Sequence, residues 1–507
     1  MNRTALLALL TLAFSAGCGG GTTPPRVAAS GQATDTSNRN EAVIASGKAS
    51  ADQPEPSAPA AIAGPHAEPD RPDVRIDPSS SPWLGAEATS RYLWSGRQEH
   101  QVAIWVNVPV VEERRRLPTA VVMTVDTSGS MAGVKIHHAR ESAHTVVQQL
   151  ADGDLLALHS FESRVHRHSP LRSLHPETRA QLGAVIGRFY ANGATNLYQA
   201  VLDAKGAVAH APATHPVRRV ILISDGRPTV GPGSPHELGR LGEQAIAQGI
   251  QISALGIGLD YDEHTLNALA ERSSGRLYHL ESTEQLASIV EEELNLVQTT
   301  LATNASLELV PAPGVTIYAP HWGYHTRGTS GSIRFPLGSL YSGQAREFVV
   351  RVRLRSPALG DRALLSARLY FTDHHEGGLA RVQETIVRGT LTDDEGLAAS
   401  SPNQRASAIV ATFRAADLTD HAARDANAGR LDAADRQLAQ AEAELRRSSQ
   451  RASSPKLKQR LTRSAESLAA RRRKVEKARR APAASRPQKS RASSLELNDW
   501  AREATGF

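Results

Sequence analysis

Short apolar runs alternate with amphipathic stretches between residues 117 and 300. Thr119–Val125 is a nearly continuous β-branched run, the pattern of a strand buried on both faces of a parallel sheet. An amphipathic helix is predicted after it, from about Val134 to Leu150. Further strands are predicted at Leu155–Ser160, Val217–Ser224, Gln251–Ile257 and Leu277–His279. This alternation predicts an α/β fold with a doubly wound, mostly parallel, Rossmann-like sheet over residues 117–300.

The segments on either side of this domain show a period of two instead. In Gln101–Val111 and in Phe348–Leu354, apolar side chains alternate with polar or small ones, as in a strand with one buried face. We therefore expect a flanking antiparallel β-sandwich formed by residues 301–395 and supplemented by strands in residues 81–116. The α/β domain would then be inserted between strands of one sandwich.

The C-terminal part has a helical composition and most of the positive charge. Residues 396–480 carry Ala/Leu faces broken at Asn427–Gly429 and Ser448–Pro455, which predicts a helical hairpin, and residues 481–507 are expected to be a basic disordered tail. Residues 401–507 hold 23 Lys or Arg against 12 Asp or Glu, while the whole chain carries a net charge of +6. The basic run Arg471–Arg480 is interpreted as a solvated helix end, with contact to anionic lipid as the alternative; no nucleic-acid partner is expected.

The N-terminal 18 residues look like an export signal. A positively charged start is followed by the apolar run Ala5–Phe14 and by small residues ending in Cys18, the only cysteine. This resembles a bacterial lipoprotein signal, in which Cys18 would be lipidated, although Ser15 stands where Leu is usual and a simple cleaved signal peptide is the alternative. Residues 19–80 are rich in Gly, Pro and Ser and are expected to form a disordered tether. The predicted location is the cell envelope, lipid-anchored, with the outer membrane or the periplasmic face favoured.

Three short motifs stand out in the α/β domain, the first at the end of its first predicted strand. They lie at Val125–Met131, Gly193–Leu197 and Ile221–Gly226. The order D-x-S-x-S, then T, then D-G after a hydrophobic strand resembles that of the von Willebrand factor A family, over a bit more than a third of the chain. All five positions of the family's metal site are matched, by Asp126, Ser128, Ser130, Thr195 and Asp225.

The residue types suit a hard divalent cation. Mg²⁺ prefers oxygen ligands in octahedral geometry, and hydroxyl and carboxylate side chains from three loops at the carboxyl edge of a parallel sheet provide them. The resemblance implies Mg²⁺, or Mn²⁺ or Ca²⁺, with one coordination position left for an Asp or Glu of a protein partner. Adjacent His137 and His138 lack the spacing of a zinc centre.

An enzyme is not expected from this sequence. It contains no G-x-x-x-x-G-K-[ST] phosphate loop and no G-x-S-x-G nucleophile elbow. Ser128 occupies the position at which an aspartyl-phosphate enzyme would need a second acid. We therefore predict a metal-dependent protein-binding lipoprotein without a small-molecule substrate. The alternative is a structural scaffold of envelope assembly in which the metal only stabilises the fold.

The predicted anchor can be tested with Cys18→Ser. Acyl chains contribute about 0.8 kcal/mol per buried CH₂ to membrane binding, so their loss should move the protein from the detergent fraction to the soluble one. Cell fractionation and mass spectrometry of the mature N-terminus measure this. Unmutated protein that is already soluble, and that begins near residue 19 without lipid, would contradict the prediction.

Overall fold

The computed structural model describes residues 75–76, 83–111, 116–280, 283–319, 323–355, 358–375 and 377–506, without the side chains of 75–76 and 283–287. Cys18, the expected leader and nearly all of the expected tether lie outside the described residues. Pro69–Phe507 form one compact unit. Among the helices described, none is both long and apolar enough to cross a membrane.

The α/β domain is built on a six-stranded sheet with the order β10-β9-β8-β5-β6-β7. Its strands are β5 (Thr119–Asp126), β6 (Leu155–Phe161), β7 (Val165–Ser173), β8 (Val217–Ser224), β9 (Ile250–Ile257) and β10 (Leu277–Leu280). All neighbours pair in parallel except β6 and β7. Strand β7 is thus a nine-residue antiparallel strand at one edge of the sheet.

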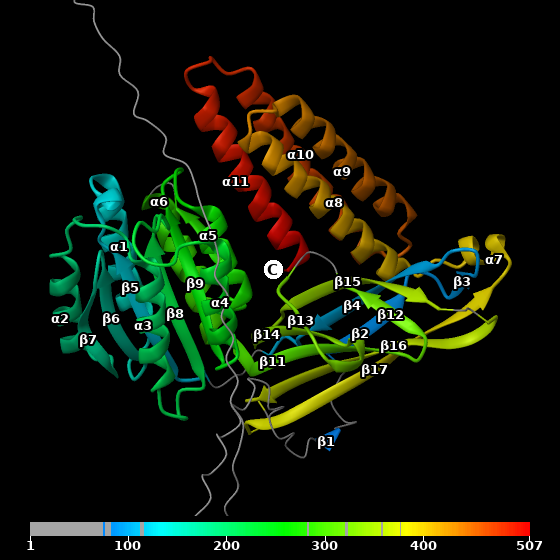
Figure 1. Ribbon diagram of the computed structural model, residues 1–507, viewed down its shortest axis with the longest axis horizontal. Coiled ribbons are helices and arrows are strands. Elements are labelled where there is room, and N and C mark those ends of the chain that lie inside the picture. The colour runs from blue at the N-terminus through cyan, green and yellow to red at the C-terminus, as the bar shows by residue number, and fades with distance from the viewer. Residues whose placement is uncertain are drawn as a thin grey trace, which may run out of the picture. The chain divides into compact units, whose positions relative to one another are not determined.

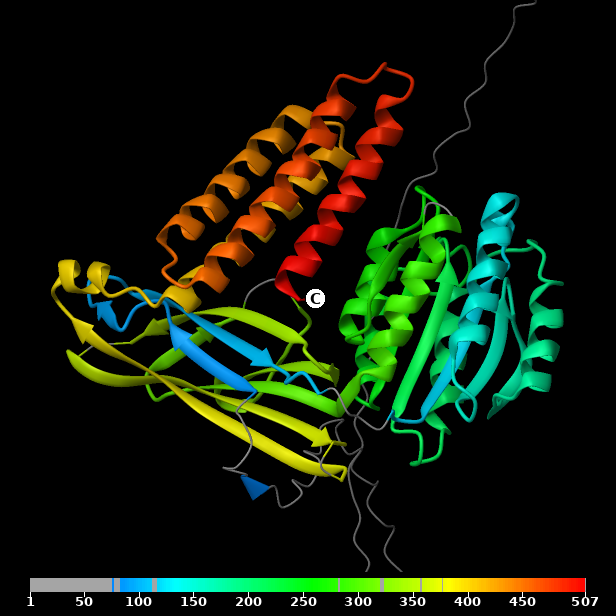
Figure 2. The same cartoon turned by 180° about the vertical axis from the view of Figure 1, so that it is seen from behind.

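Helices cover both faces of this sheet (Figures 1 and 2). They are α1 (Val134–Gln149), α2 (Pro176–Ile186), α3 (Leu197–Ala209), α4 (Pro235–Ile246), α5 (Glu263–Arg272) and α6 (Thr283–Gln298). Successive side chains of β5 enter two different cores, Val121 and Met123 with α1 and α6, and Ala120 and Val122 with α3, α4 and α5. This two-sided burial explains the unbroken apolar run, and it confirms the predicted doubly wound α/β fold class.

Two further sheets pack face to face beside it. The seven-stranded sheet contains β1 (Arg75–Ile76), β3 (Tyr92–Trp94), β11 (Thr300–Pro311), β13 (Thr326–Arg327), β14 (Ile333–Tyr341), β16 (Gly360–Asp373) and β17 (Leu379–Thr392). The four-stranded sheet contains β2 (Leu84–Ala88), β4 (Glu99–Asn107), β12 (Val315–Tyr318) and β15 (Ala345–Leu354). Strand β4 pairs antiparallel with β15, placing Ile104 opposite Phe348. Strands that precede the α/β domain in sequence thus belong to the same sandwich as strands that follow it.

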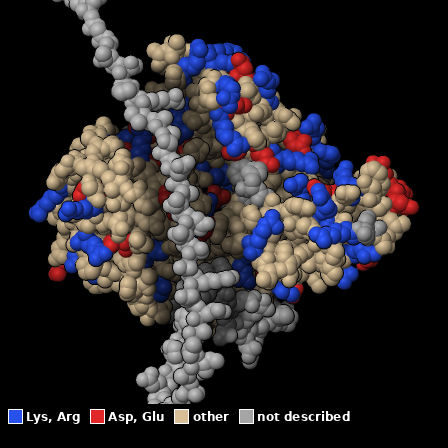
Figure 3. Space-filling view, viewed as in Figure 1, with Lys and Arg blue, Asp and Glu red and all other residues tan. Residues whose placement is uncertain are grey.

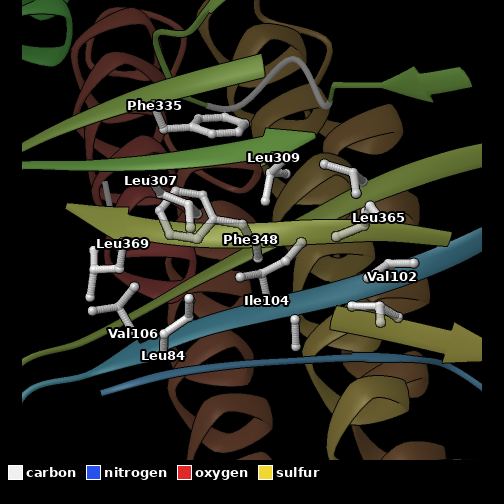
Figure 4. Close-up of a cluster of buried hydrophobic side chains, with 14 of the residues drawn as sticks. Leu84, Val102, Ile104, Val106, Leu307, Leu309, Phe335, Phe348, Leu365 and Leu369 are labelled. Atoms are coloured by element: carbon white, nitrogen blue, oxygen red, sulfur yellow. The ribbon is translucent and has the colours of Figure 1, made fainter. Parts of the chain in front are cut away.

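The sandwich core lies between the two sheets (Figure 4). Ile104 and Phe348 from the smaller sheet and Leu307, Phe335 and Leu369 from the larger one are fully buried there. Alternation along each strand selects these side chains, because every second residue faces the opposite sheet.

The C-terminal part is a four-helix bundle rather than a hairpin with a disordered tail. Its helices are α8 (Gln404–Asn427), α9 (Leu431–Arg451), α10 (Pro455–Arg479) and α11 (Arg486–Thr505), preceded by the short α7 (Glu395–Ser400). The prediction of disorder for residues 481–507 was wrong, because α11 packs along α8 and buries Leu497 and Trp500 in the bundle core. The small buried side chains Ser490, Ser493 and Ser494 on α11 gave no hydrophobic period to detect.

The basic charge of this part is largely paired within the bundle. Arg472 bonds to Asp435 at 2.7 Å, Lys474 to Glu496 at 2.7 Å, and Arg479 to Asp432 at 2.7 Å. Figure 3 shows Lys and Arg side chains gathered over the bundle with acidic ones among them. The run interpreted as a solvated helix end is thus bound to neighbouring helices through acidic partners.

The contribution of the early strands to the sandwich can be measured with two isoleucines. Ile104→Ala removes a fully buried side chain and should lower the free energy of unfolding by about 2–5 kcal/mol. Ile386→Ala, on a strand of the facing sheet, is the matched control, because Ile386 is 55% exposed and its truncation leaves no cavity. Urea unfolding of the full chain compares them. Equal effects of the two substitutions would show that β4 does not help to form the core.

Candidate metal centre

The first loop of the predicted site follows β5 directly. Asp126, the last residue of that strand, is fully buried, and its Oδ1 accepts a hydrogen bond from the Ser128 N–H at 2.8 Å. The short 3-10 turn Gly129–Met131 then begins, with Ser128 before it. Its geometry leaves the Ser128 and Ser130 hydroxyl oxygens 3.1 Å apart, with Ser128 buried and Ser130 exposed. Two hydroxyls and one carboxylate thus lie within a single turn.

Thr195 reaches the same edge from a second loop. Backbone hydrogen bonds join this loop to the first one, from Gly129 N–H to Gly193 O at 3.0 Å and from Asn192 N–H to Thr127 O at 2.8 Å. Thr195 itself is 2% exposed. The next residue, Asn196, caps α3 by accepting a hydrogen bond from the Gln199 N–H.

Asp225 follows β8 and brings the third loop. The residue after it, Gly226, has a φ of +64°, and a Cβ there would lie 2.6 Å from Leu266, so this sharp turn requires glycine. The Asp225 carbonyl accepts a hydrogen bond from the Asp262 N–H at 2.9 Å, where α5 begins. All five predicted residues therefore lie at the carboxyl edge of the parallel sheet, Asp126 at the end of β5 and the other four on loops.

Burial governs the charge of Asp126. It raises the pKa of this carboxyl to about 6, against hydrogen bonds from Ser128 and Ser224, and the nearby negative charge of Asp225 adds to the rise. The Ser224 hydroxyl donates to Asp126 Oδ2 at 2.5 Å. Ser224 was not singled out in the sequence, because a serine at the end of a buried strand gives no distinct signal.

Only one of the two carboxylate oxygens of Asp225 forms a salt bridge among the described residues. Its Oδ2 accepts a hydrogen bond from Lys135 Nζ at 3.1 Å, and the same ammonium group lies 2.9 Å from Asp260 Oδ1. The other oxygen, Asp225 Oδ1, is buried and has no hydrogen-bond partner among the described residues. Lys135 was not singled out from the sequence, because a lysine in the first turn of a helix is usually a solvated side chain.

The donor set fits a hard cation. A buried carboxylate oxygen without a partner lies beside a second buried carboxylate, and the hydroxyls of two serines and a threonine lie on adjoining loops. Such oxygens are the ligands that Mg²⁺ and Ca²⁺ prefer. No group of three or more His, Cys, Asp or Glu within the described part of the chain is arranged to hold a metal, so the hydroxyls are essential to any site here.

The N-terminus of α5 also connects this edge to the bundle. Glu263 is 4% exposed, and its carboxylate accepts hydrogen bonds from three residues of α11, Asn498 at 2.7 Å, Arg491 at 3.3 Å and Arg502 at 3.4 Å. Because Asp262 beside it holds the Asp225 loop, the position of α11 is linked to the candidate centre through two adjacent residues.

Comparison with known proteins covers the same region. The family model of the von Willebrand factor type A domain matches residues 120–292. The inter-alpha-trypsin inhibitor heavy chain H2 of Sus scrofa is 27% identical over 206 residues, which are 39% of this chain and 22% of that protein. The E3 ubiquitin-protein ligase WAV3 of Arabidopsis thaliana is 25% identical over 52% of this chain and 35% of its own length. The chain thus spans only about a fifth to a third of these relatives.

Solved structures extend the similarity of the fold beyond the α/β domain. A von Willebrand factor type A protein from Catenulispora acidiphila aligns with a TM-score of 0.65 and 20% identity, over 84% of this chain and 98% of its own. The ArnB paralog VWA2 of Sulfolobus acidocaldarius aligns with a TM-score of 0.54 and 17% identity, over 83% and 98%. At these identities the similarity concerns the fold alone.

Sequence and fold agree on the identity of the central domain. The matched residues are those that carry the three loops of the candidate centre. Domains of this family typically mediate protein–protein interaction, often through a metal ion-dependent adhesion site. Residues 120–292 of this chain are a von Willebrand factor type A domain.

Proposed function

We propose that this chain binds a protein partner through a Mg²⁺ ion held by its A domain. The proposed ligands are Asp126, Ser128, Ser130, Thr195 and Asp225. The observation that carries the proposal is the buried Asp225 Oδ1, which has no hydrogen-bond partner among the described residues although it lies beside a second buried carboxylate. An unpaired buried carboxylate oxygen is costly, and a divalent cation would compensate both acids at once.

The proposed ligands and Lys135 have different roles in partner binding. The two carboxylates supply negative charge from the buried side, while Ser130 is exposed at the mouth of the site. When bound, the ion would supply an electrophilic centre for an Asp or Glu of the partner. The chain's own Lys135 offsets the charge on Asp225 Oδ2, so the site carries less negative charge against an approaching acidic side chain.

A hollow beside the site offers room for neighbouring parts of the partner. It has a volume of about 480 Å³ and is lined by Arg227, Asp260 and Glu263 of the A domain and by Asn427 and Arg491 of the bundle. Arg227 and Asp260 lie 3.6 Å apart at its rim and are both about half exposed. Charged side chains of both signs at this rim favour a polar partner surface.

The proposal includes anchoring at the cell envelope through a lipidated Cys18. Its support is the short apolar run before Cys18 and the Gly-, Pro- and Ser-rich segment after it. A segment of that length would let the A domain reach partners away from the membrane surface.

The charge of Asp126 gives a pH test in the metal-free state. With EDTA present, the folded pKa of about 6 lies above the ordinary value of 3.8, so the folded state binds more protons between these values and loses stability as the pH rises through them. Asp126→Asn removes that loss. The variant should gain about 3 kcal/mol in free energy of unfolding, relative to the unmutated chain, between pH 4 and pH 7.

Urea unfolding at several pH values measures this difference. If the difference in free energy of unfolding between the two proteins stays constant from pH 4 to pH 7, deprotonation of the Asp126 carboxyl does not destabilise the folded chain. The same experiment with Mg²⁺ added should reduce the loss, because the ion binds the deprotonated carboxylate.

Metal dependence gives the direct test of function. Mg²⁺ should raise the melting temperature of the full chain, by the equivalent of about 2.7 kcal/mol at a hundredfold excess over Kd, and Asp126→Ala and Thr195→Ala should abolish the rise. Asp152→Ala is the matched control, because this 67% exposed side chain lies in the turn before β6, at the opposite edge of the sheet.

A pull-down from envelope extract extends the test to the partner. The partner should be retained with Mg²⁺ and lost with EDTA or with Asp126→Ala. If the partner is retained despite EDTA and despite Asp126→Ala, while Mg²⁺ still raises the melting temperature of the unmutated chain, the result would instead support a scaffold whose metal only stabilises the fold. An equal metal response of the unmutated chain and Asp126→Ala would contradict the proposed ligands.

A further inference from the structure

A second cavity lies at the opposite end of the A domain from the candidate metal centre. It has a volume of about 920 Å³, within the range of small-molecule sites in proteins. Residues of α6 and β10, of β15 and of α11 all line it. Its apolar wall includes Leu277, Ile289, Leu296 and Tyr324. A ligand there would need an organic body to fill this space.

Arg346 lines this cavity without an acidic partner. It is 8% exposed, and no hydrogen bond or ion pair joins its guanidinium group to any described residue, with Nε buried and unsatisfied. Burial lowers the pKa of Arg346 to about 10; Tyr341 opposes this fall, and the nearby positive charges of Arg276 and Arg219 add to it. The group is still charged at neutral pH, so an uncompensated cation faces the cavity.

Most of the other charged side chains that line the cavity form ion pairs. Arg276 lies 2.6 Å from Glu292, Arg502 forms an ion pair with Asp499, and Asp420 lies 2.8 Å from Arg424. The remaining acids are Glu271, which accepts a hydrogen bond from the Gly323 N–H at 3.1 Å, and Glu503, which is exposed. None of these acids lies within ion-pair distance of Arg346.

Arg219 shows how a buried arginine is compensated elsewhere in the same region. It is fully buried, and it donates to Glu293 Oε1 at 3.2 Å and to the Tyr341 hydroxyl at 3.1 Å. Glu293 is held in turn by Ser253 at 2.7 Å and Tyr278 at 2.8 Å. One cation and one anion therefore balance behind Tyr341, which leaves the charge of Arg346 on the cavity side without a counter-charge.

The sequence pattern makes Arg346 unusual as well. Along β15 it has the same parity as Phe348, Val350 and Val352, which are all buried. A charged residue at an inward position destabilises the fold unless an opposite charge compensates it. Binding sites retain such destabilising residues because function requires them.

We propose that this cavity binds a small organic molecule through a carboxylate or phosphate group paired with Arg346. The planar guanidinium presents two parallel N–H donors that match such an oxyanion. Tyr341, whose hydroxyl accepts a hydrogen bond from Arg219, also lines the cavity. This site is separate from the proposed metal centre and does not rest on it.

The experiment compares two arginines that flank the same tyrosine. Thermal unfolding of the full chain is followed in chloride buffer with EDTA, so that the probe anions cannot bind through a metal ion. Arg346→Met should raise the melting temperature by about 2 °C or more, because it removes an unpaired buried charge. Arg219→Met should lower it, because it leaves the buried Glu293 carboxylate without its cation.

Sodium benzoate and sodium phosphate, at matched ionic strength, then serve as probes. At least one should raise the melting temperature of the unmutated chain and of a control such as Arg388→Met, whose side chain is 61% exposed, but not that of Arg346→Met. A lower melting temperature of Arg346→Met in chloride would show that the guanidinium already has a partner within the chain and would overturn the proposal. Equal responses of the unmutated chain and Arg346→Met to both probes would overturn it as well.

Discussion

Two carboxylates buried at one edge of a parallel sheet are the constraint on which the candidate site depends. Asp126 and Asp225 end neighbouring central strands, so their charges must lie close together and away from water. Two like charges in such a place require positive charge nearby. Lys135 meets part of this need, and Asp225 Oδ1 is left for a cation from solution.

The surrounding fold holds this costly arrangement in place. The β5 loop is joined by backbone hydrogen bonds to the loop that carries Thr195, and the Asp225 loop is held by the N-terminus of α5. That same N-terminus receives three residues of α11 through Glu263. The C-terminal bundle is therefore part of the support of the candidate centre, and a change in the position of α11 would act on the loop that carries Asp225.

The sequence predicted the parts of the fold whose side chains repeat with a clear period. The unbroken run of β5 indicated a strand buried on both faces, and the five oxygen-bearing residues could be named because they stand at fixed places in three short motifs. Helix α11 was missed, because Ser490 and Ser493 pack tightly without being apolar. Lys135 and Arg346 were missed for another reason. The role of Lys135 depends on acidic partners from distant segments, and that of Arg346 on the lack of such a partner in the fold.

We propose that a divalent cation completes this pair of carboxylates. Anomalous diffraction from crystals grown with Mn²⁺ in place of Mg²⁺ tests it most directly, because the signal locates the ion without assuming its ligands. We expect one strong peak at about the metal–oxygen distance of 2.1 Å from the hydroxyl oxygens of Ser128 and Ser130. Absence of a peak there at saturating Mn²⁺, with Lys135 still on Asp225, would contradict it.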